Sequence, residues 1–84
     1  MGIIKGMVVK SVAGHDKGSF YTVVDIADGV VYIADGKRRK LEKPKRKNPK
    51  HVKVTTTILE LDGMTNKRLR SSLSVFNPCQ PKPF

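Results

Sequence analysis

Residues 6–34, which read GMVVKSVAGHDKGSFYTVVDIADGVVYIA, decide the fold of this chain. Two runs of β-branched and aromatic residues, 6–13 and 19–27, flank the loop Gly14–Gly18. Runs of this kind, joined by a short loop bounded by glycines, predict two antiparallel strands in a hairpin. Both runs carry apolar residues on both faces, and a β-bulge near Val23-Val24 would reconcile this pattern with the pleat of a sheet.

Two Asp-Gly pairs mark further turns, because Asp and Gly suit positions that need positive φ. Asp28-Gly29 predicts a tight turn into a third strand over residues 30–34. Asp35-Gly36 predicts a second turn of the same kind, followed by a short fourth strand over residues 37–41 with Leu41 facing inward.

Residues 51–58 alternate well enough to predict a fifth strand. Val52, Val54 and Ile58 are expected to share its inner face, because an antiparallel strand with one wet side alternates apolar and polar residues. The expected wet face consists of His51, Lys53, Thr55 and Thr57. Five short strands with no room for helical crossovers predict a mainly-β fold, either a small antiparallel barrel or a partly open sandwich.

The pattern changes over residues 65–76, where Leu69, Leu73 and Phe76 recur at helical spacing. This stretch predicts an amphipathic α-helix with Thr65 as its N-cap, ended by Asn77-Pro78. A helix of about three turns is marginal alone in water. We therefore expect its apolar stripe to pack on the barrel or on another protein.

The chain has 84 residues with 38% apolar content, which is enough for one small core and one domain. We expect a barrel over residues 1–61, which includes a basic arm at 37–51, and a C-terminal helix over 62–77 packed on it. Residues 78–84 form a Pro-rich tail that we expect to be extended or disordered.

The net charge of +10 is concentrated in one segment. Residues 37–53 hold ten Lys and Arg residues against a single acidic residue, Glu42. Like charges at this density repel one another, so the segment predicts a polyanionic partner. Pro44 and Pro49 interrupt any helix there, and the near absence of aliphatic residues disfavours a membrane-surface helix.

Other functional classes find little support in the sequence. No apolar run approaches the roughly 20 residues of a membrane span, and the N-terminus has no pattern of an export signal, so we expect the chain in the cytosol. Cys79 is the single cysteine, and His15 and His51 are the only histidines in the sequence. We therefore expect no disulfide, metal site or cofactor. The glycines precede a strand rather than a helix, so nucleotide hydrolysis is not expected.

The loop Gly14–Gly18 offers two interpretations besides catalysis. His15 and Asp16 are neighbours on a short exposed loop with no nucleophile around them, so we expect no enzymatic activity. The two glycines and Asp16 suit a turn, whereas His15, Lys17 and the glycine backbone suit contact with a nucleic acid.

The few aromatic residues, Phe20, Tyr21 and Tyr32 among them, can equally fill the core as stack on bases. We therefore expect binding dominated by phosphate contacts and RNA shape. If about six Lys and Arg residues neutralise phosphates, log affinity falls with log salt at a slope of roughly −4 to −5.

With residues 6–11 before it and 21–24 after it, the loop Gly14–Gly18 resembles a KOW motif. The stretch 34–51, ADGKRRKLEKPKRKNPKH, extends the match. Together they resemble bacterial KOW-domain RNA-binding proteins related to archaeal and eukaryotic large-subunit ribosomal proteins of the L-fourteen-e type. The resemblance implies an SH3-like barrel, RNA binding, association with ribosomes and no catalysis. It makes the loop and the basic arm the expected RNA contacts.

The leading hypothesis is a non-enzymatic RNA-binding module for structured ribosomal RNA of the large subunit, monomeric away from the RNA. The candidate contacts are Gly14, His15, Lys17, Gly18, Lys37, Arg38, Arg39, Lys40, Lys43, Lys45, Arg46, Lys47, Lys50 and His51. Arg38, Arg39 and residues 45–47 are the strongest of them. Two alternatives remain: a protein-interaction barrel that docks on a ribosomal, transcription or other acidic protein, and DNA binding through Lys67, Arg68 and Arg70.

Overall fold

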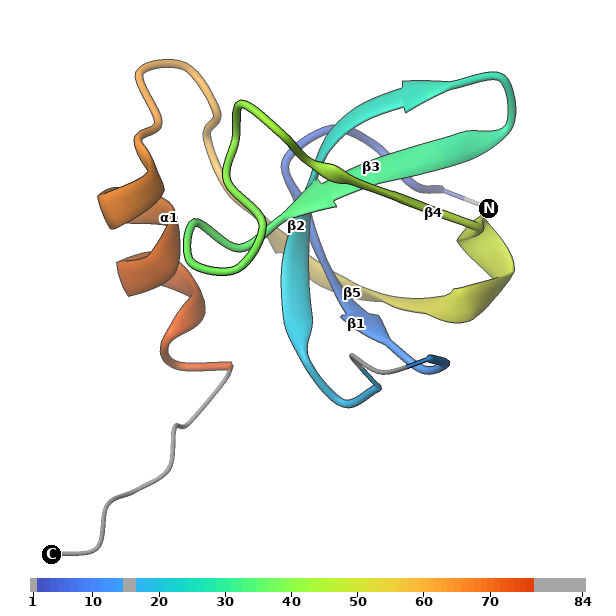
Figure 1. Ribbon diagram of the computed structural model, residues 1–84. Helices are drawn as coiled ribbons and strands as arrows, with labels where there is room; N and C mark the ends of the chain where they lie inside the picture. Colours follow the sequence, from blue (N-terminus) through green and yellow to red (C-terminus); the bar gives the residue numbers. More distant parts are fainter. Residues whose placement is uncertain (1, 15–16, 77–84) are drawn as a thin grey trace, which may run out of the picture.

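The computed structural model describes residues 2–14 and 17–76. Within these residues, five antiparallel strands form one curved sheet in the order β4-β3-β2-β1-β5, and a single α-helix packs beside it (Figure 1). The arrangement is consistent with a small SH3-like barrel, and it confirms the mainly-β prediction with one C-terminal helix. The elements are β1 (Met7–Ser11), β2 (Phe20–Ala27), β3 (Val30–Ala34), β4 (Lys45–Lys47), the 3-10 helix η1 (Pro49–His51), β5 (Val52–Ile58) and α1 (Asn66–Leu73).

The β2–β3 hairpin forms as its turn residues predict. Asp28 and Gly29 adopt φ of 51° and 76° between the paired residues Ala27 and Val30. Positive φ at both central residues is the geometry of a two-residue turn whose twist matches the flanking strands. Further along β2 the register shifts between Val23 and Asp25, which confirms the predicted bulge.

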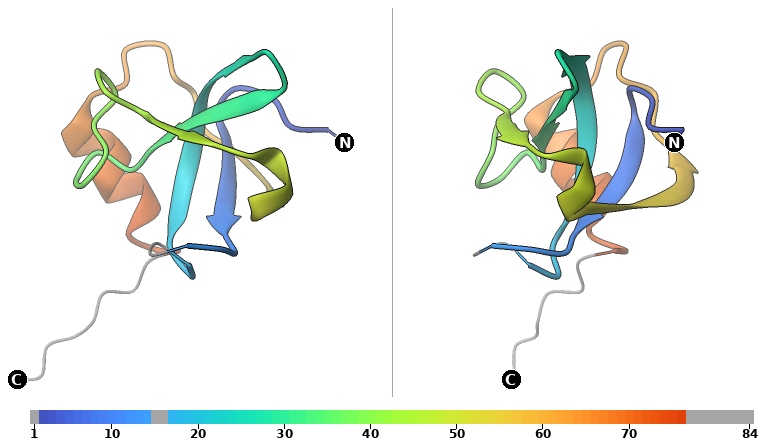
Figure 2. Two further views of the ribbon diagram at one scale, coloured as in Figure 1. Left: turned by 45° about the vertical axis from the view of Figure 1, so that its right-hand side comes forward. Right: turned by 90° about the vertical axis from the view of Figure 1, so that its right-hand side faces the viewer.

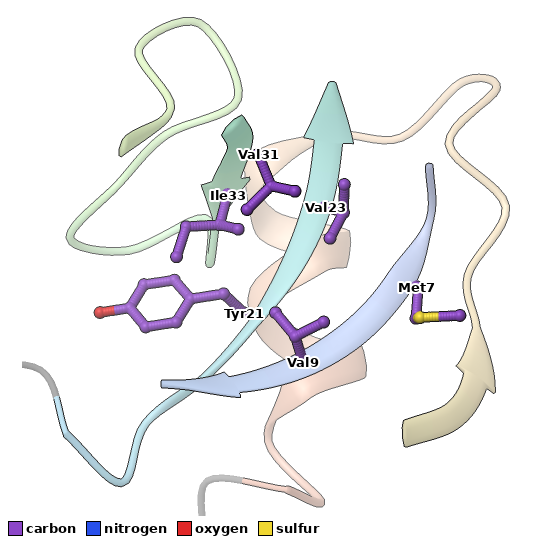
Figure 3. Close-up of a cluster of buried hydrophobic side chains, with 6 residues drawn as sticks. All are labelled: Met7, Val9, Tyr21, Val23, Val31 and Ile33. Atoms are coloured by element: carbon purple, nitrogen blue, oxygen red, sulfur yellow. The ribbon is translucent and has the colours of Figure 1, made fainter. Parts of the chain in front are cut away.

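Two separate cores explain why the first two strands are apolar on both faces. The first core lies inside the curved sheet (Figure 3) and consists of Met7, Val9, Tyr21, Val23, Val31 and Ile33. The second core lies between the sheet and α1 and consists of Val8, Ala34, Leu69 and Leu73. Val23 packs in the first core while its neighbour Val24 packs against the second. Successive strand residues face opposite sides, so each face of these strands serves one core.

The helix α1 begins as predicted but ends earlier. The Thr65 hydroxyl accepts a hydrogen bond from the backbone N–H of Arg68 at 3.2 Å, which confirms the N-cap. The prediction that the helix reaches Phe76 is wrong, because α1 ends at Leu73. The Ser74 hydroxyl donates to the Ser71 carbonyl at 2.7 Å, and serine bonds of this kind compete with the helical ladder. Phe76 still packs on Phe20, with ring centroids 5.3 Å apart.

The predicted fourth strand over residues 37–41 is wrong. These residues lie in a loop, and the fourth strand is Lys45–Lys47, paired with β3. The Asp35 carboxylate accepts hydrogen bonds from the backbone N–H of Lys37 at 2.8 Å and of Arg39 at 2.9 Å. The backbone N–H of Asp35 also donates to the Arg39 carbonyl at 2.9 Å. Backbone groups satisfied within a local turn are not available to a strand ladder. Leu41 nevertheless packs against the second core, as its inward direction predicts.

The face assignment of β5 is also wrong. Val52 packs against the first core, but Val54 and Ile58 are 45% and 53% exposed. Thr55 is half-buried instead, and its hydroxyl donates to the Val8 carbonyl at 2.6 Å. The register between β1 and β5 shifts between Met7 and Val9, and such an irregularity breaks the period of two on which the prediction depended.

In residues 2–14 and 17–76, no helix has the length and apolar character required to cross a bilayer. The predicted tail 78–84, with Cys79, lies outside the described residues, as do Asn77-Pro78 and the pair His15-Asp16.

Candidate functional site

The positively charged residues between β3 and β4 form a basic loop, residues 37–43, that is fixed to the start of α1. The backbone N–H of Leu41 donates to Asn66 Oδ1 at 2.7 Å. Asn66 Nδ2 in turn donates to Glu42 Oε1 at 2.8 Å. One side chain on the helix therefore holds two successive loop residues, and the loop lies beside α1 (Figure 2).

Gly36 allows this close approach of loop and helix. Its φ is +79°, and a Cβ at this position would collide with the Asn66 carbonyl oxygen and lie 3.0 Å from the Arg70 nitrogen. A side chain at this position would both strain the backbone and push α1 away. The glycine of the Asp35-Gly36 pair thus serves helix packing rather than the hairpin turn that the sequence predicts.

The cations of the basic loop are exposed and form no ion pair within the described residues. The side chains of Lys37, Arg38, Arg39, Lys40 and Lys43 are exposed. Across the described ranges, the ion pair within 4.0 Å is Lys5–Asp25, at 3.6 Å, so none of these five cations forms one. The hydrogen bond from the Asn66 side chain lowers the pKa of Glu42 below its usual value of 4.5. The backbone N–H of Glu42 and the charge of Lys40 lower this pKa further by smaller amounts. Glu42 is therefore ionised at neutral pH, and the loop presents a concentrated positive field.

A surface hollow of about 370 Å³ lies in this loop, lined by Arg38, Arg39, Lys40, Glu42 and Lys43. Ligand sites for small molecules begin at roughly 300 Å³, so the hollow has room for a single nucleotide. Arg and Lys side chains are the usual donors to phosphate oxygens, and the fork of arginine binds them in bidentate fashion. The hollow is suited to an anionic ligand.

The three basic residues of β4 divide between two faces. Lys45 and Lys47 pair with Ile33 and Val31, whose side chains fill the first core. Lys47 is only 8% exposed, and its Nζ donates to the Ala13 carbonyl at 2.9 Å. The expectation that Lys47 contacts RNA is therefore corrected, because its stem covers the core and its ammonium binds the protein's own backbone. Arg46, opposite Tyr32, is exposed.

Adjacent residues of β4 should therefore respond differently to removal of charge. On the prediction that the protein binds RNA, Arg46→Met should lower the affinity for RNA about five- to eightfold in about 0.1 M salt, the value of one lost phosphate contact. Lys47→Met should instead lower the free energy of unfolding by about 1 kcal/mol, because the Ala13 carbonyl loses its donor. Its effect on the log affinity for RNA should be less than half that of Arg46→Met. Fluorescence anisotropy with labelled RNA and urea denaturation measure the two effects. Equal losses of affinity would contradict the assignment of Lys47 to a structural role.

The remaining predicted contacts lie at another end of the domain (Figure 1). Lys50 and His51 are exposed on η1, which Asn48 caps by accepting a hydrogen bond from the Lys50 N–H at 2.9 Å. The His51 carbonyl accepts from the Val12 N–H at 2.9 Å, so η1 lies beside the base of the β1–β2 loop.

In that loop Gly14, Lys17 and Gly18 are exposed, and His15 lies outside the described residues. The sequence predicts one extended arm of RNA contacts, whereas the structure places the predicted contacts in two clusters. The first cluster is the basic loop beside α1, and the second consists of Arg46, η1 and the β1–β2 loop. Each cluster is held in place by backbone hydrogen bonds, so its cations project from a defined surface.

Sequence reasoning missed the residues that position the basic loop and one pair of cations. Asp35 is predicted as a hairpin-turn residue, whereas its carboxylate binds the backbone of the loop that follows. Asn66 lies 25 residues from Leu41, and no local signal indicates that its side chain meets the loop backbone. Lys10 and Lys53 lie directly opposite each other on β1 and β5, and both are exposed. Because both side chains are exposed, the pair adds to the positive surface of the domain. Like charges placed opposite one another also destabilise a sheet. Only the strand register brings them together.

The connection between Asn66 and Glu42 has a pH-dependent consequence. Glu42 has a lowered pKa in the folded state, so its contribution to stability is present above about pH 4.5 and is lost as the pH falls below that value. Asn66→Ala removes this contribution and the bond to Leu41, and it should lower the free energy of unfolding at neutral pH.

The difference between wild type and Asn66→Ala should narrow as the pH falls through about 4.5, and the pKa of Glu42 should rise in the variant. Urea denaturation over this pH range and NMR titration of the Glu42 carboxyl measure both quantities. A difference that stays constant with pH would contradict the role of the Asn66–Glu42 bond.

Within the part of the chain that the structure describes, no group of three His, Cys, Asp or Glu side chains could hold a metal ion. The sequence matches no protein-family model and no curated protein. Charge and geometry therefore carry the functional inference.

Proposed function

We propose that this protein is a non-enzymatic RNA-binding module whose basic loop contacts the phosphate backbone of a structured RNA. One observation carries the proposal. Lys37, Arg38, Arg39 and Lys40 are four successive exposed cations on a loop that Asp35 and Asn66 fix in place. Their mutual repulsion costs stability in the free protein, and a polyanion that binds them relieves it. Arg46 and Lys50 add positive charge in the second cluster.

The aromatic residues support recognition of RNA through phosphates and shape. Of the four aromatic residues in the described ranges, Tyr21 is buried, and Phe20, Tyr32 and Phe76 are half-buried. Single-stranded binders stack successive bases on exposed rings, which these residues do not provide. Recognition of structured RNA instead uses phosphate and 2′-hydroxyl contacts. The resemblance to KOW-domain proteins favours large-subunit ribosomal RNA as the target and the cytosol as the location.

Sedimentation of the tagged protein from cell lysate through sucrose gradients tests the ribosomal target. We expect co-migration with the large ribosomal subunit at low monovalent salt, with a fraction retained at high salt, because a specific site adds contacts beyond the salt-sensitive phosphate term. A protein that stays at the top of the gradient in both conditions would contradict the ribosomal assignment.

One observation favours a second candidate, a protein-interaction module of the transcription or translation machinery. Strand β5 is at the edge of the sheet, and its Val54 and Ile58 are exposed. Edge strands with exposed apolar residues are places where an extended segment of another protein can add to the sheet. Competition separates the candidates: an RNA that displaces the bound protein partner indicates a shared surface, and a partner that binds beside the RNA indicates that β5 is its site.

A further inference from the structure

The basic loop contains one feature that phosphate binding does not need. The hollow lined by Arg38, Arg39, Lys40 and Lys43 also includes the carboxylate of Glu42. A carboxylate in a pure phosphate site would repel the ligand. Among the described residues Glu42 forms no ion pair with the cations around it, and its Oε1 is held by Asn66 Nδ2 at 2.8 Å. The side chain is thus fixed at the hollow by an uncharged group.

Fixing the loop uses only part of the hydrogen-bonding capacity of this carboxylate. An ionised carboxylate has two oxygens and about four acceptor positions, of which the Asn66 side chain takes one and the backbone N–H of Glu42 takes another. A ligand for this hollow should therefore combine an anionic group, which suits the four cations, with N–H donors that suit the remaining positions of Glu42.

Guanine nucleotides combine these two features. The Watson–Crick edge of guanine carries two adjacent donors, N1–H and the N2 amino group, at the spacing of the two oxygens of a carboxylate. Adenine and cytosine place an acceptor nitrogen beside their amino group, and uracil places its single N–H between two carbonyls. In each of these three bases an acceptor lone pair would face a carboxylate oxygen. Sequence-specific RNA recognition reads such edges on unpaired bases, which can also stack on arginine guanidinium planes.

We infer that the hollow binds one unpaired guanine of the RNA, with Glu42 accepting from its N1–H and N2–H and the surrounding cations holding the flanking phosphates. This inference rests on the proposed function and gives it a point of base specificity. Bidentate contacts to a base discriminate by roughly 5- to 150-fold, and an exposed site such as Glu42 should lie at the low end, about five- to tenfold.

A set of RNA hairpins that differ at one loop position tests the inference. The position carries guanine, inosine or uracil in an otherwise uridine loop, and fluorescence anisotropy at fixed salt gives the affinity of each. We expect wild-type protein to prefer guanine over uracil about five- to tenfold. Inosine, which lacks the N2 amino group, should be intermediate.

Glu42→Gln is the informative variant. Glutamine retains an oxygen that accepts from Asn66, so the loop stays attached to α1, but it replaces the other oxygen by an amide that clashes with guanine donors. We expect the guanine preference to disappear, while the affinity for the uracil hairpin stays equal or rises because a negative charge is removed. An unchanged Leu41 amide resonance in the NMR spectrum shows that the loop is intact.

Lys43→Gln is the matched control, because it should weaken all three hairpins by the same factor. Wild-type protein that binds all three hairpins equally, with the usual salt dependence, overturns the guanine site and leaves the proposed function standing. A guanine preference that survives in Glu42→Gln overturns the role of Glu42. Protein that binds none of the hairpins at low salt contradicts both proposals.

Discussion

Replacing Arg38, Arg39 and Lys40 together by glutamine is expected to lower the affinity for structured RNA about 100- to 500-fold in about 0.1 M salt. Each neutralised phosphate contributes about 0.7 to 0.9 to the slope of log affinity against log salt. Three lost contacts therefore reduce the slope by about 2.1 to 2.7, and log affinity at a tenth molar salt falls by the same amount. The three side chains are exposed, so the free energy of unfolding should stay the same or rise as repulsion is relieved.

The matched control removes the same number of charges from α1, the helix beside the basic loop. Lys67, Arg68 and Arg70 are exposed on α1, and their replacement by glutamine lowers the net charge equally while it keeps residues that favour helix. We expect the affinity of this variant for RNA to fall less than about tenfold, because only the long-range attraction is reduced. Anisotropy titrations with one labelled RNA compare the two. Equal losses would mean that total charge, rather than the basic loop, determines binding.

Replacing Leu69 by alanine is expected to lower the free energy of unfolding by about 2 to 5 kcal/mol. Leu69 is 0% exposed and packs with Val8, Ala34 and Leu73 between α1 and the sheet. The substitution removes buried apolar contacts and leaves a cavity in the second core. Domains of this size are stable by only a few kcal/mol, so the variant should be largely destabilised near physiological temperature.

Val75→Ala is the control for this effect, because Val75 is 79% exposed and should change stability by less than about 0.5 kcal/mol. Urea denaturation followed by circular dichroism gives both values. Leu69→Ala should also weaken RNA binding, since the basic loop depends on α1 for its attachment. A Leu69→Ala protein as stable as wild type would contradict the packing of α1 on the sheet.

Local signals account for the parts of the fold that the sequence predicts. Asp and Gly tolerate the positive φ angles of the turn at Asp28-Gly29, so these two residues are enough to predict it. The hydroxyl of Thr65 reaches the Arg68 N–H three residues on, so this residue is enough to predict the cap. The bulge near Val23 follows from two consecutive valines that both need burial. Each of these features depends on residues within a few positions of one another, so the sequence alone contains the information.

Most of the features that the sequence does not predict depend on long-range contacts; the exception is the loop at 37–41, which depends on the nearby Asp35. The sequence predicts a strand at 37–41, but the Asp35 side chain takes up the backbone donors there. Lys47 looks like any other cation of the basic arm, and only its pairing with Val31 turns it toward the first core. Asn66 is 25 residues from Leu41, to which it is bonded. The charge of the site was therefore predictable, whereas the division of that charge into two clusters was not.

These long-range contacts link the second core to the proposed site. The second core holds α1 on the sheet, α1 presents Asn66, and Asn66 holds Leu41 and Glu42 at the hollow. The cations of the basic loop therefore have a fixed arrangement without any apolar core of their own. This explains how a segment with a single aliphatic residue, Leu41, can stay ordered on a small domain.

The central claim, RNA binding by a fixed cluster of cations, is tested most directly by the salt dependence of affinity for a structured RNA and a DNA duplex of equal length. We expect log affinity for the RNA to fall with log salt at a slope of roughly −4 to −5, and the RNA to bind more tightly than the DNA at every salt concentration. Binding that is insensitive to salt, or no binding to either nucleic acid at low salt, would contradict the account.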